Sequence, residues 1–167
     1  MAPDQEIRAS HLVAAPQDEL FDFLADLENH WRLADRFIDV LALERDADGH
    51  ARGGRVRMRG PGGVRRTAAT QVLAADTPQQ MLGVAEVGRR TRAFVTWKLR
   101  DGDGGTRVRL EATIAQIGWL DRLLLVLGGR AWLERRFDAV LHRLADTFRL
   151  HAKALEARQP QLGGRKS

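Results

Sequence analysis

Hydrophobic and polar residues alternate through the middle of the chain and recur at helical spacing toward both ends. From Phe37 to about Ile117 the apolar period is two, and turn residues such as Asp48-Gly49 and the run from Asp101 to Gly105 separate the alternating segments. With a further alternating segment near the N-terminus, this pattern predicts seven strands, over residues 6–14, 37–43, 55–59, 64–74, 80–87, 91–99 and 106–114. Because most connections are short, we expect antiparallel pairing with one buried face and one wet face.

Helical spacing predicts two short helices after the first strand and one long helix near the C-terminal end. Pro16 precedes the first of these, Gln17–Ala25, which carries acidic residues in or near its first turn, and the second covers Glu28–Ala34. An apolar stripe from Leu120 is interrupted at Gly128-Gly129, and a second stripe predicts a helix from residue 130 to about residue 157. This order of elements predicts an α+β domain with helices on one side of an antiparallel sheet.

The composition predicts one globular domain over residues 6–157, with flexible tails at 1–5 and 158–167. The chain has no Cys, which excludes disulfides, thiolate metal sites and Cys nucleophiles, and it has no Tyr. The first 15 residues carry charges and lack an apolar signal region, so we expect a cytoplasmic location. The longest apolar run, Leu123 to Leu127, is too short to span a bilayer.

The formal charge of +5 is unevenly distributed. Residues 1–48 hold 12 acidic and 4 basic residues, whereas the rest of the chain holds 10 acidic and 23 basic residues. A basic sheet face raises the question of a nucleic-acid partner, but sheet-based RNA readers also need exposed aromatic side chains on which bases stack. Only Phe94 shares the strand parity of Arg92 and Lys98. We therefore expect no specific nucleic-acid binding.

His11 is the candidate polar residue of the interior, because it shares strand parity with Val13. A buried imidazole could act as a general base or bond to a ligand carbonyl. The alternative is a histidine at the rim, or one whose hydrogen bonds are satisfied within the protein. His142 lies four residues from Asp138 and from Asp146, which is typical of a solvated charge row on a helix. Since the histidines share no ligand spacing, we expect no metal site and no cofactor.

Several ordered segments carry a resemblance to a known family. They are Val13-Ala14-Ala15-Pro16 followed by Glu19 to Asp26, Thr96-Trp97-Lys98-Leu99, Gly105-Thr106-Arg107-Val108, and Leu133 to Leu144. With the order of elements from Glu6 to about Ala157, they resemble the START-like (SRPBCC) superfamily, in its polyketide cyclase/dehydrase and lipid-transport branch. The resemblance implies a helix-grip fold, in which a curved antiparallel sheet of about seven strands wraps around a long C-terminal helix, with two short helices after strand 1.

The resemblance also implies an apolar cavity between the sheet and the long helix. Its implied lining consists of Trp31, Phe37, Val56, Met58, Leu82, Val84, Phe94, Leu110, Phe137 and Leu141. The alternative is that these side chains fill the core completely. For Phe94 the parity shared with Arg92 and Lys98 conflicts with a place in the lining, since one face of a strand cannot be both wet and enclosed.

A cavity of this kind predicts binding of a hydrophobic small molecule such as a lipid, a quinone or a polyketide-like compound. The alternative interpretation is a polyketide cyclase or aromatase that acts on a poly-carbonyl substrate. Arg55, Arg57 and Arg59 could polarise such a substrate, but Val56 and Met58 on the opposite parity are better core residues, so we expect the arginines to point outward. No catalytic set is identifiable from the sequence.

The segment from Trp119 to Leu127 is apolar around nearly its whole helical circumference. We expect it to be buried within the monomer. The alternatives are a lid over the cavity mouth, a homodimer contact and a site of transient membrane contact. Exposure of this segment would favour a partner-binding or membrane-associated chaperone of the quinone-binding kind.

Overall fold

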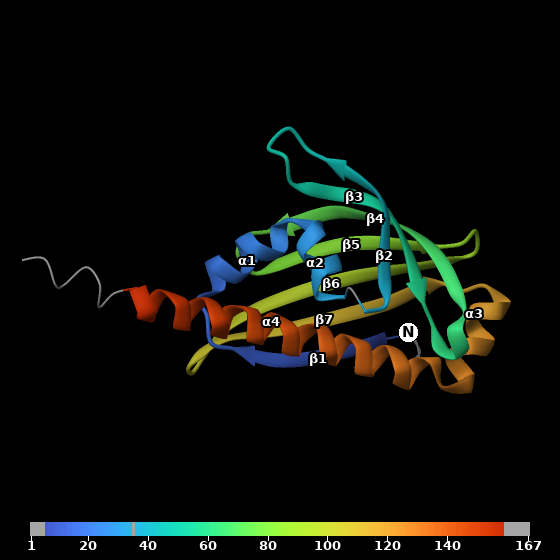
Figure 1. The fold of residues 1–167 in the computed structure, drawn as a ribbon. Coiled ribbons are helices and arrows are strands. Elements are labelled where there is room, and N and C mark those ends of the chain that lie inside the picture. The colour runs from blue at the N-terminus through green and yellow to red at the C-terminus, as the bar shows by residue number, and fades with distance from the viewer. Residues whose placement is uncertain (1–5, 35, 159–167) are drawn as a thin grey trace, which may run out of the picture.

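The computed structural model describes residues 6–34 and 36–158, and one antiparallel sheet is its largest element (Figure 1). The seven strands are β1 (Glu6–Val13), β2 (Ile38–Arg45), β3 (Ala51–Arg59), β4 (Arg65–Asp76), β5 (Gln80–Val87), β6 (Thr91–Gly102) and β7 (Gly105–Gln116). Their order across the sheet is β1-β7-β6-β5-β4-β3-β2. Six strands therefore form a meander, and β1 closes it by pairing with the last strand, β7.

The helices are α1 (Gln17–Ala25), α2 (Leu27–Leu33), α3 (Trp119–Leu124) and α4 (Arg130–Arg158), and a π-helical turn over Leu125–Gly129 joins α3 to α4. Asp26 caps α2, because its Oδ1 accepts hydrogen bonds from the N–H of Glu28 at 2.9 Å and from the N–H of Ala51 at 3.3 Å. One carboxylate thus both starts α2 and ties it to β3. None of these helices is long and apolar enough to cross a membrane, as far as the described residues extend.

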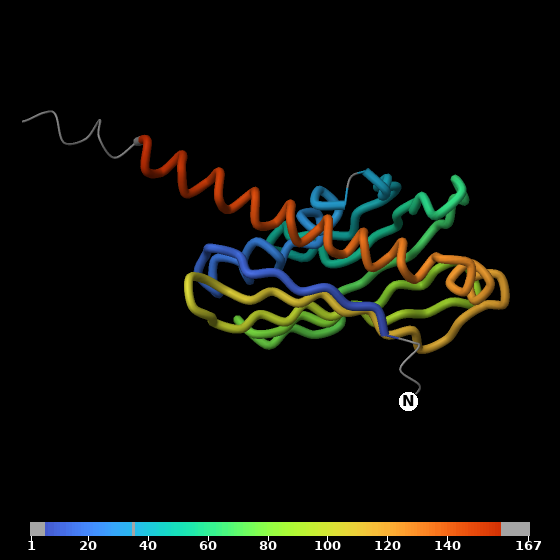
Figure 2. Tube along the Cα trace, turned by 90° about the horizontal axis from the view of Figure 1, so that it is seen from below, coloured from blue at the N-terminus to red at the C-terminus, as the bar shows by residue number. Residues whose placement is uncertain are grey.

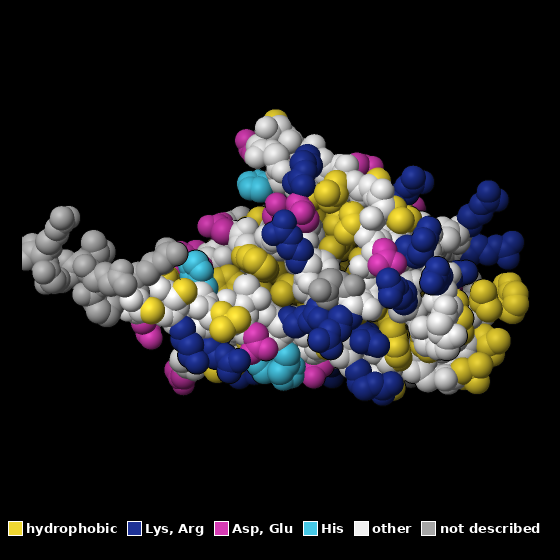
Figure 3. All heavy atoms as spheres, viewed as in Figure 1, with side chains coloured by type: hydrophobic (Ala, Val, Ile, Leu, Met, Phe, Trp, Pro, Cys, Tyr) yellow, Lys and Arg dark blue, Asp and Glu magenta, His cyan; other side chains and the backbone are white. Residues whose placement is uncertain are grey.

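Helices α1, α2 and α4 lie on one face of the sheet, which curves toward them (Figures 1 and 2). Helix α4 runs along β1, and its last turns extend past the sheet. The main core lies between these layers and contains the fully buried side chains of Leu20, Leu24, Leu99, Leu141 and Leu144. Charged side chains cover much of the face seen in Figure 3, whereas apolar side chains gather at the end where α3 lies.

The strand register separates the inner face of the sheet from the outer face. Trp97 of β6 lies opposite Met81 of β5 and Leu110 of β7, and all three are buried on the inner face. On β3, Val56 is buried, whereas the neighbouring Arg55 and Arg57 are exposed, as predicted. Alternation of this kind is what a sheet with one covered face requires.

The structure confirms the predicted helix-grip architecture, with its seven strands, its two short helices after β1 and its long C-terminal helix. The strand limits differ most at β3, which begins at Ala51 rather than Arg55. Gly53 and Gly54 carry no side chain that could reveal alternation, so the sequence indicated a turn there. The predicted tails lie outside the described residues, except for Arg158, which ends α4.

Candidate ligand-binding site

Two adjoining cavities lie between the inner face of the sheet and the helices. The first has a volume of about 190 Å³ and the second about 240 Å³. They share a wall formed by Phe37, Met58, Ala85, Val95, Leu133 and Phe137. Small-molecule sites usually measure about 300–1,000 Å³. Each cavity alone is therefore small, and a ligand of ordinary size needs both.

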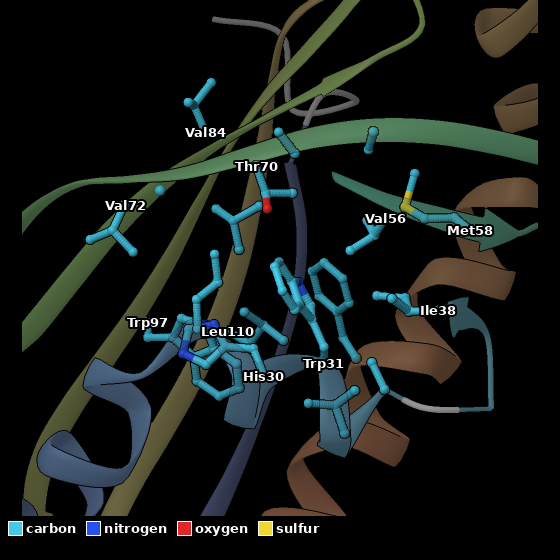
Figure 4. A pocket seen from close by; sticks show the side chains of 18 of the residues that line it. His30, Trp31, Ile38, Val56, Met58, Thr70, Val72, Val84, Trp97 and Leu110 are labelled. Atoms are coloured by element: carbon cyan, nitrogen blue, oxygen red, sulfur yellow. The ribbon is translucent and has the colours of Figure 1, made fainter. Parts of the chain in front are cut away.

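Small side chains on β4 and β5 create the first cavity. Four of the inner positions on these strands are occupied by Ala68, Thr70, Gly83 and Ala85, which leave space that larger side chains would fill. Bulky apolar side chains, among them Trp31 of α2 and Val56 of β3, enclose this space from the other sides (Figure 4). The cavity is thus a consequence of side-chain size along two strands.

Thr70 supplies a polar atom to this apolar wall. Its Oγ1 is buried and has no hydrogen-bond partner among the described residues. Figure 4 shows the hydroxyl on the cavity side of β4, facing the space enclosed by Trp31 and Leu110. A buried hydroxyl without a partner costs about 1–3 kcal/mol, so this group is available to a bound molecule.

His30 of α2 lies on the wall of the first cavity, with its ring centroid 5.0 Å from that of Trp97. Burial lowers the pKa of His30 to about 4, against the opposing effects of the Leu24 carbonyl and the Asp26 carboxylate. The ring is therefore neutral at pH 7. Its Nε2 lies 2.6 Å from the carbonyl oxygen of Leu24, so Nε2 carries the proton and Nδ1 is left as an acceptor.

A polar cluster lies on the wall of the second cavity, beside α3. Asp121 Oδ2 accepts hydrogen bonds from Arg66 Nη2, at 2.8 Å, and from the hydroxyl of Thr91. The Thr91 Oγ1 in turn accepts the N–H of Gly118 at 3.0 Å. The Nε of Arg66 is buried and has no partner within the described part of the chain. Each cavity is thus lined by one β4 residue that has a buried, unpaired polar atom.

Seven of the predicted lining residues border these cavities: Trp31, Phe37, Val56, Met58, Val84, Leu110 and Phe137. Val84 differs from the others, because it pairs with Phe94 and its side chain lies on the outer face of the sheet. Its neighbours Gly83 and Ala85 are small, so the main chain of Val84 forms that part of the wall.

The other three predicted lining residues and the candidate polar residue His11 lie away from both cavities. His11 points to the inner side as expected, but it stands between β1 and α4 with its ring 4.4 Å from that of His142. Leu82 and Phe94 belong to the outer face, because β5 and β6 direct their other parity inward. Leu141 is completely buried in the main core.

The polar residues of the site were missed at the sequence level, although a signal was present. His30 follows Leu27 by three positions, which places both on one face of α2. Thr70 and Arg66 share strand parity with the small residue Ala68, which is fully buried. Within residues 6–34 and 36–158, no three His, Asp or Glu side chains gather as metal ligands, at the site or away from it.

The segment over α3 and the π-helical turn is not buried as expected. Leu124 and Leu125 do line the second cavity. However, Trp119, Val126 and Leu127 are 70%, 78% and 73% exposed. The prediction of burial within the monomer is therefore wrong for these side chains, because the inward side of α3 is already occupied by other residues.

The sequence matches a family described as polyketide cyclase/dehydrase and lipid transport, over residues 4–149. No curated protein matches it significantly.

Solved structures share the fold at low sequence identity. TTHA0849 from Thermus thermophilus is 20% identical, with a TM-score of 0.63, covering 84% of this chain and 94% of that one. A START superfamily protein from Mycobacterium smegmatis is 17% identical, with a TM-score of 0.54, covering 80% and 97%. DynU16, a putative protein in the dynemicin biosynthetic locus, is 19% identical, with a TM-score of 0.56, covering 88% and 48%. At these identities the likeness extends to the fold alone.

Proposed function

The chain belongs to the polyketide cyclase/dehydrase and lipid-transport family, and on that basis we propose that it binds a hydrophobic small molecule in its two adjoining cavities. Candidate classes are lipids, quinones and polyketide-like compounds. The observation that carries the proposal is the pair of cavities with almost entirely apolar walls between the sheet and α4. Apolar walls with a few placed polar groups are typical of small-molecule sites.

The polar groups in the walls favour a ligand with hydrogen-bonding atoms at two places. Thr70 borders the first cavity and Arg66 the second, and both have a buried atom without a partner in the described residues. They are four residues apart on the inner face of β4, which corresponds to about 13 Å along a strand. An elongated molecule with an acceptor near each end would satisfy both.

Native mass spectrometry of the purified protein tests the proposal, with Ala85→Leu as the variant. Ala85 lies on the wall that both cavities share, so a leucine there would fill space in each. The matched control is Ala69→Leu, an exposed position on the outer face of β4. We expect a small-molecule adduct on the wild type and on the control, and its loss from Ala85→Leu.

A titration with cis-parinaric acid covers the case in which the ligand is lost during purification. We expect saturable binding to the wild type and at least tenfold weaker binding to Ala85→Leu. Wild-type protein that shows neither an adduct nor saturable binding of this probe would overturn the proposal, as would equal binding by Ala85→Leu.

The second candidate function is a cyclase-type enzyme acting on a poly-carbonyl substrate. The observation that favours it is the buried Nε–H of Arg66, which lines the second cavity and has no hydrogen-bond partner among the described residues, because a fixed cationic donor can polarise a carbonyl oxygen. A carrier releases its ligand unchanged, whereas an enzyme converts it. Incubation with a linear poly-β-ketone thioester separates the two, and we expect no product if the protein is a carrier.

The single domain over residues 6–157 and the cytoplasmic location stay predictions.

A further inference from the structure

Five apolar side chains form an exposed surface at the end of the molecule where α3 lies (Figures 1 and 3). They are Trp119, Leu120, Leu123, Val126 and Leu127, all of them at least 37% exposed, and we call them the apolar tip. Exposed apolar side chains are unremarkable when scattered, but a contiguous group on one short segment indicates contact with something outside the protein.

The outward direction of the tip is fixed by the contacts on the other side of the helix. Asp121, Leu124 and Leu125 line the second cavity at positions i, i+3 and i+4 of one helical face. The ion pair between Asp121 and Arg66 holds that face against the sheet. The opposite face, on which Trp119 lies, must therefore point away from the protein.

Four exposed arginines lie near the apolar tip. Arg122 belongs to α3 itself, Arg89 and Arg90 form the β5–β6 turn, and Arg65 begins β4 next to Arg66, which pairs with Asp121 of α3. All four are exposed, and none has an ion pair within the described residues. The β5–β6 turn is close to α3, because Gly118 directly precedes α3 and a Cβ added to Gly118 would lie 3.1 Å from the Cβ of Arg90.

Two acidic groups next to these arginines have arginine partners. Asp121 pairs with Arg66 at 2.8 Å, and Glu86 pairs with Arg92. The surface around the tip is therefore positively charged. An apolar surface with a tryptophan and a border of arginines is what a peripheral helix presents to the headgroup region of an anionic bilayer.

We propose that the apolar tip docks on an anionic lipid surface, with its side chains in the headgroup region and the four arginines against lipid phosphates. A second copy of the chain is a poorer partner, because a two-fold contact through the tip would bring the arginines of both copies together. Docking needs no ligand in the cavities and so goes beyond the proposed function. It would also bring the second cavity, walled by Leu124 and Leu125, next to the lipid.

Vesicle co-sedimentation tests the proposal. The probes are vesicles of phosphatidylcholine alone and vesicles of equal parts phosphatidylcholine and phosphatidylglycerol. We expect the wild-type protein to bind the mixed vesicles at low salt, to bind them more weakly at high salt, and to bind pure phosphatidylcholine least. Absence of binding to the mixed vesicles at low salt would overturn the proposal.

The apolar contribution is measured with the triple variant Trp119→Ser, Val126→Ser and Leu127→Ser. These side chains are 70–78% exposed, so the variant should fold normally, as its thermal unfolding will check. We expect its affinity for the mixed vesicles to fall more than about 100-fold. The matched control is Leu150→Ser with Leu155→Ser, at positions 64% and 51% exposed on the far end of α4, which should bind like the wild type. Equal binding by the tip variant would contradict the inference.

The charged contribution is measured with Arg89→Gln and Arg90→Gln together. A basic side chain near an anionic membrane contributes about 1 kcal/mol, so the pair should weaken binding roughly 30-fold. The control is Arg100→Gln with Arg107→Gln, a pair of exposed arginines that lie opposite each other at the other end of the sheet. If both pairs weaken binding equally, net charge alone attracts the protein and the docking surface is wrong.

Further outcomes separate docking from its alternatives and from the proposed function. Concentration-dependent self-association that the tip variant abolishes, without vesicle binding, would assign the surface to a second copy and overturn the proposal. Ala85→Leu should keep wild-type vesicle binding, while the tip variant should keep wild-type binding of cis-parinaric acid. Loss of ligand binding with intact docking would thus contradict the proposed function alone.

Discussion

Thr70→Val removes the one hydroxyl that the first cavity keeps buried and unpaired among the described residues. Valine has nearly the same shape as threonine and the same preference for strands, so the substitution changes the polarity of the wall and little else. The Oγ1 of Thr70 has no hydrogen-bond partner within the described residues, and it borders an apolar cavity. The ligand-free protein should therefore gain stability from the substitution, whereas ligand binding should lose a contact.

The size of both effects follows from the burial of the hydroxyl. An unpaired buried hydroxyl costs about 1–3 kcal/mol, and we expect the lower end, because the cavity leaves room for a transient water. For a chain of this length, about 1 kcal/mol corresponds to a rise in Tm of roughly 2–4 °C. A ligand acceptor that loses its donor should bind roughly tenfold more weakly, which corresponds to about 1.4 kcal/mol.

Urea denaturation of the ligand-free protein and titration with the ligand released from purified protein measure the two effects. Thr67→Val, at an exposed position on the outer face of the same strand, is the matched control and should change stability by less than about 0.5 kcal/mol. A Thr70→Val protein that is less stable than the wild type would show that the hydroxyl has a partner. Unchanged ligand affinity would show that it does not contact the ligand.

Two further predictions concern helix α2 and its contact with β3. The pKa of His30 is lowered from its ordinary value of 6.5 to about 4, so the unfolded chain takes up a proton that the folded protein excludes, and stability is lost as the pH falls from about 6.5 to 4. At pH 5 this loss amounts to about 2 kcal/mol relative to pH 7, and urea denaturation should show it for the wild type but not for His30→Gln; equal losses in both proteins would refute the assignment. Gly54 has a φ of +155°, and a Cβ there would meet the Ala42 carbonyl and lie 2.9 Å from Cη2 of Trp31. Gly54→Ala should therefore destabilise the protein by more than about 1 kcal/mol and shift its tryptophan fluorescence, whereas Gly60→Ala, with 3.4 Å to its nearest neighbour, should do neither.

The fold could be predicted because the hydrophobic periodicity is strong in the strands of the sheet and in the long C-terminal helix. Segments such as Val108 to Ile114 alternate without interruption, and the stripe from Leu133 to Leu144 keeps helical spacing over several turns. The predicted start of β3, Arg55, lies after the observed start at Ala51, because Gly53 and Gly54 have no side chains that could show alternation. Periodicity thus located the elements well and their ends less well.

The site could be predicted only in part, because a period of two identifies two faces without saying which one is buried. On β5 both parities are apolar, and the lining that the resemblance implies contains the larger residues Leu82 and Val84. The structure turns them outward and turns Gly83 and Ala85 inward. A cavity wall is formed where small side chains leave space, so on this strand the small residues face the cavity and the larger side chains lie on the other face.

Several features of the molecule lower its stability as an isolated monomer. Side chains that line the two cavities lose packing contacts. Thr70 and Arg66 have buried atoms without a partner in the described chain. The apolar tip exposes Trp119, Val126 and Leu127 to water. Folded domains are stable by only about 5–15 kcal/mol, so features that lower stability are costly. Such features usually persist where they serve a function such as binding. These features are also contiguous, because the first cavity adjoins the second, and the second is walled by the helix that carries the tip. A hydrophobic ligand would fill the cavities and pair the polar atoms, and an anionic membrane would cover the tip. The two proposed partners would therefore account for all of these features.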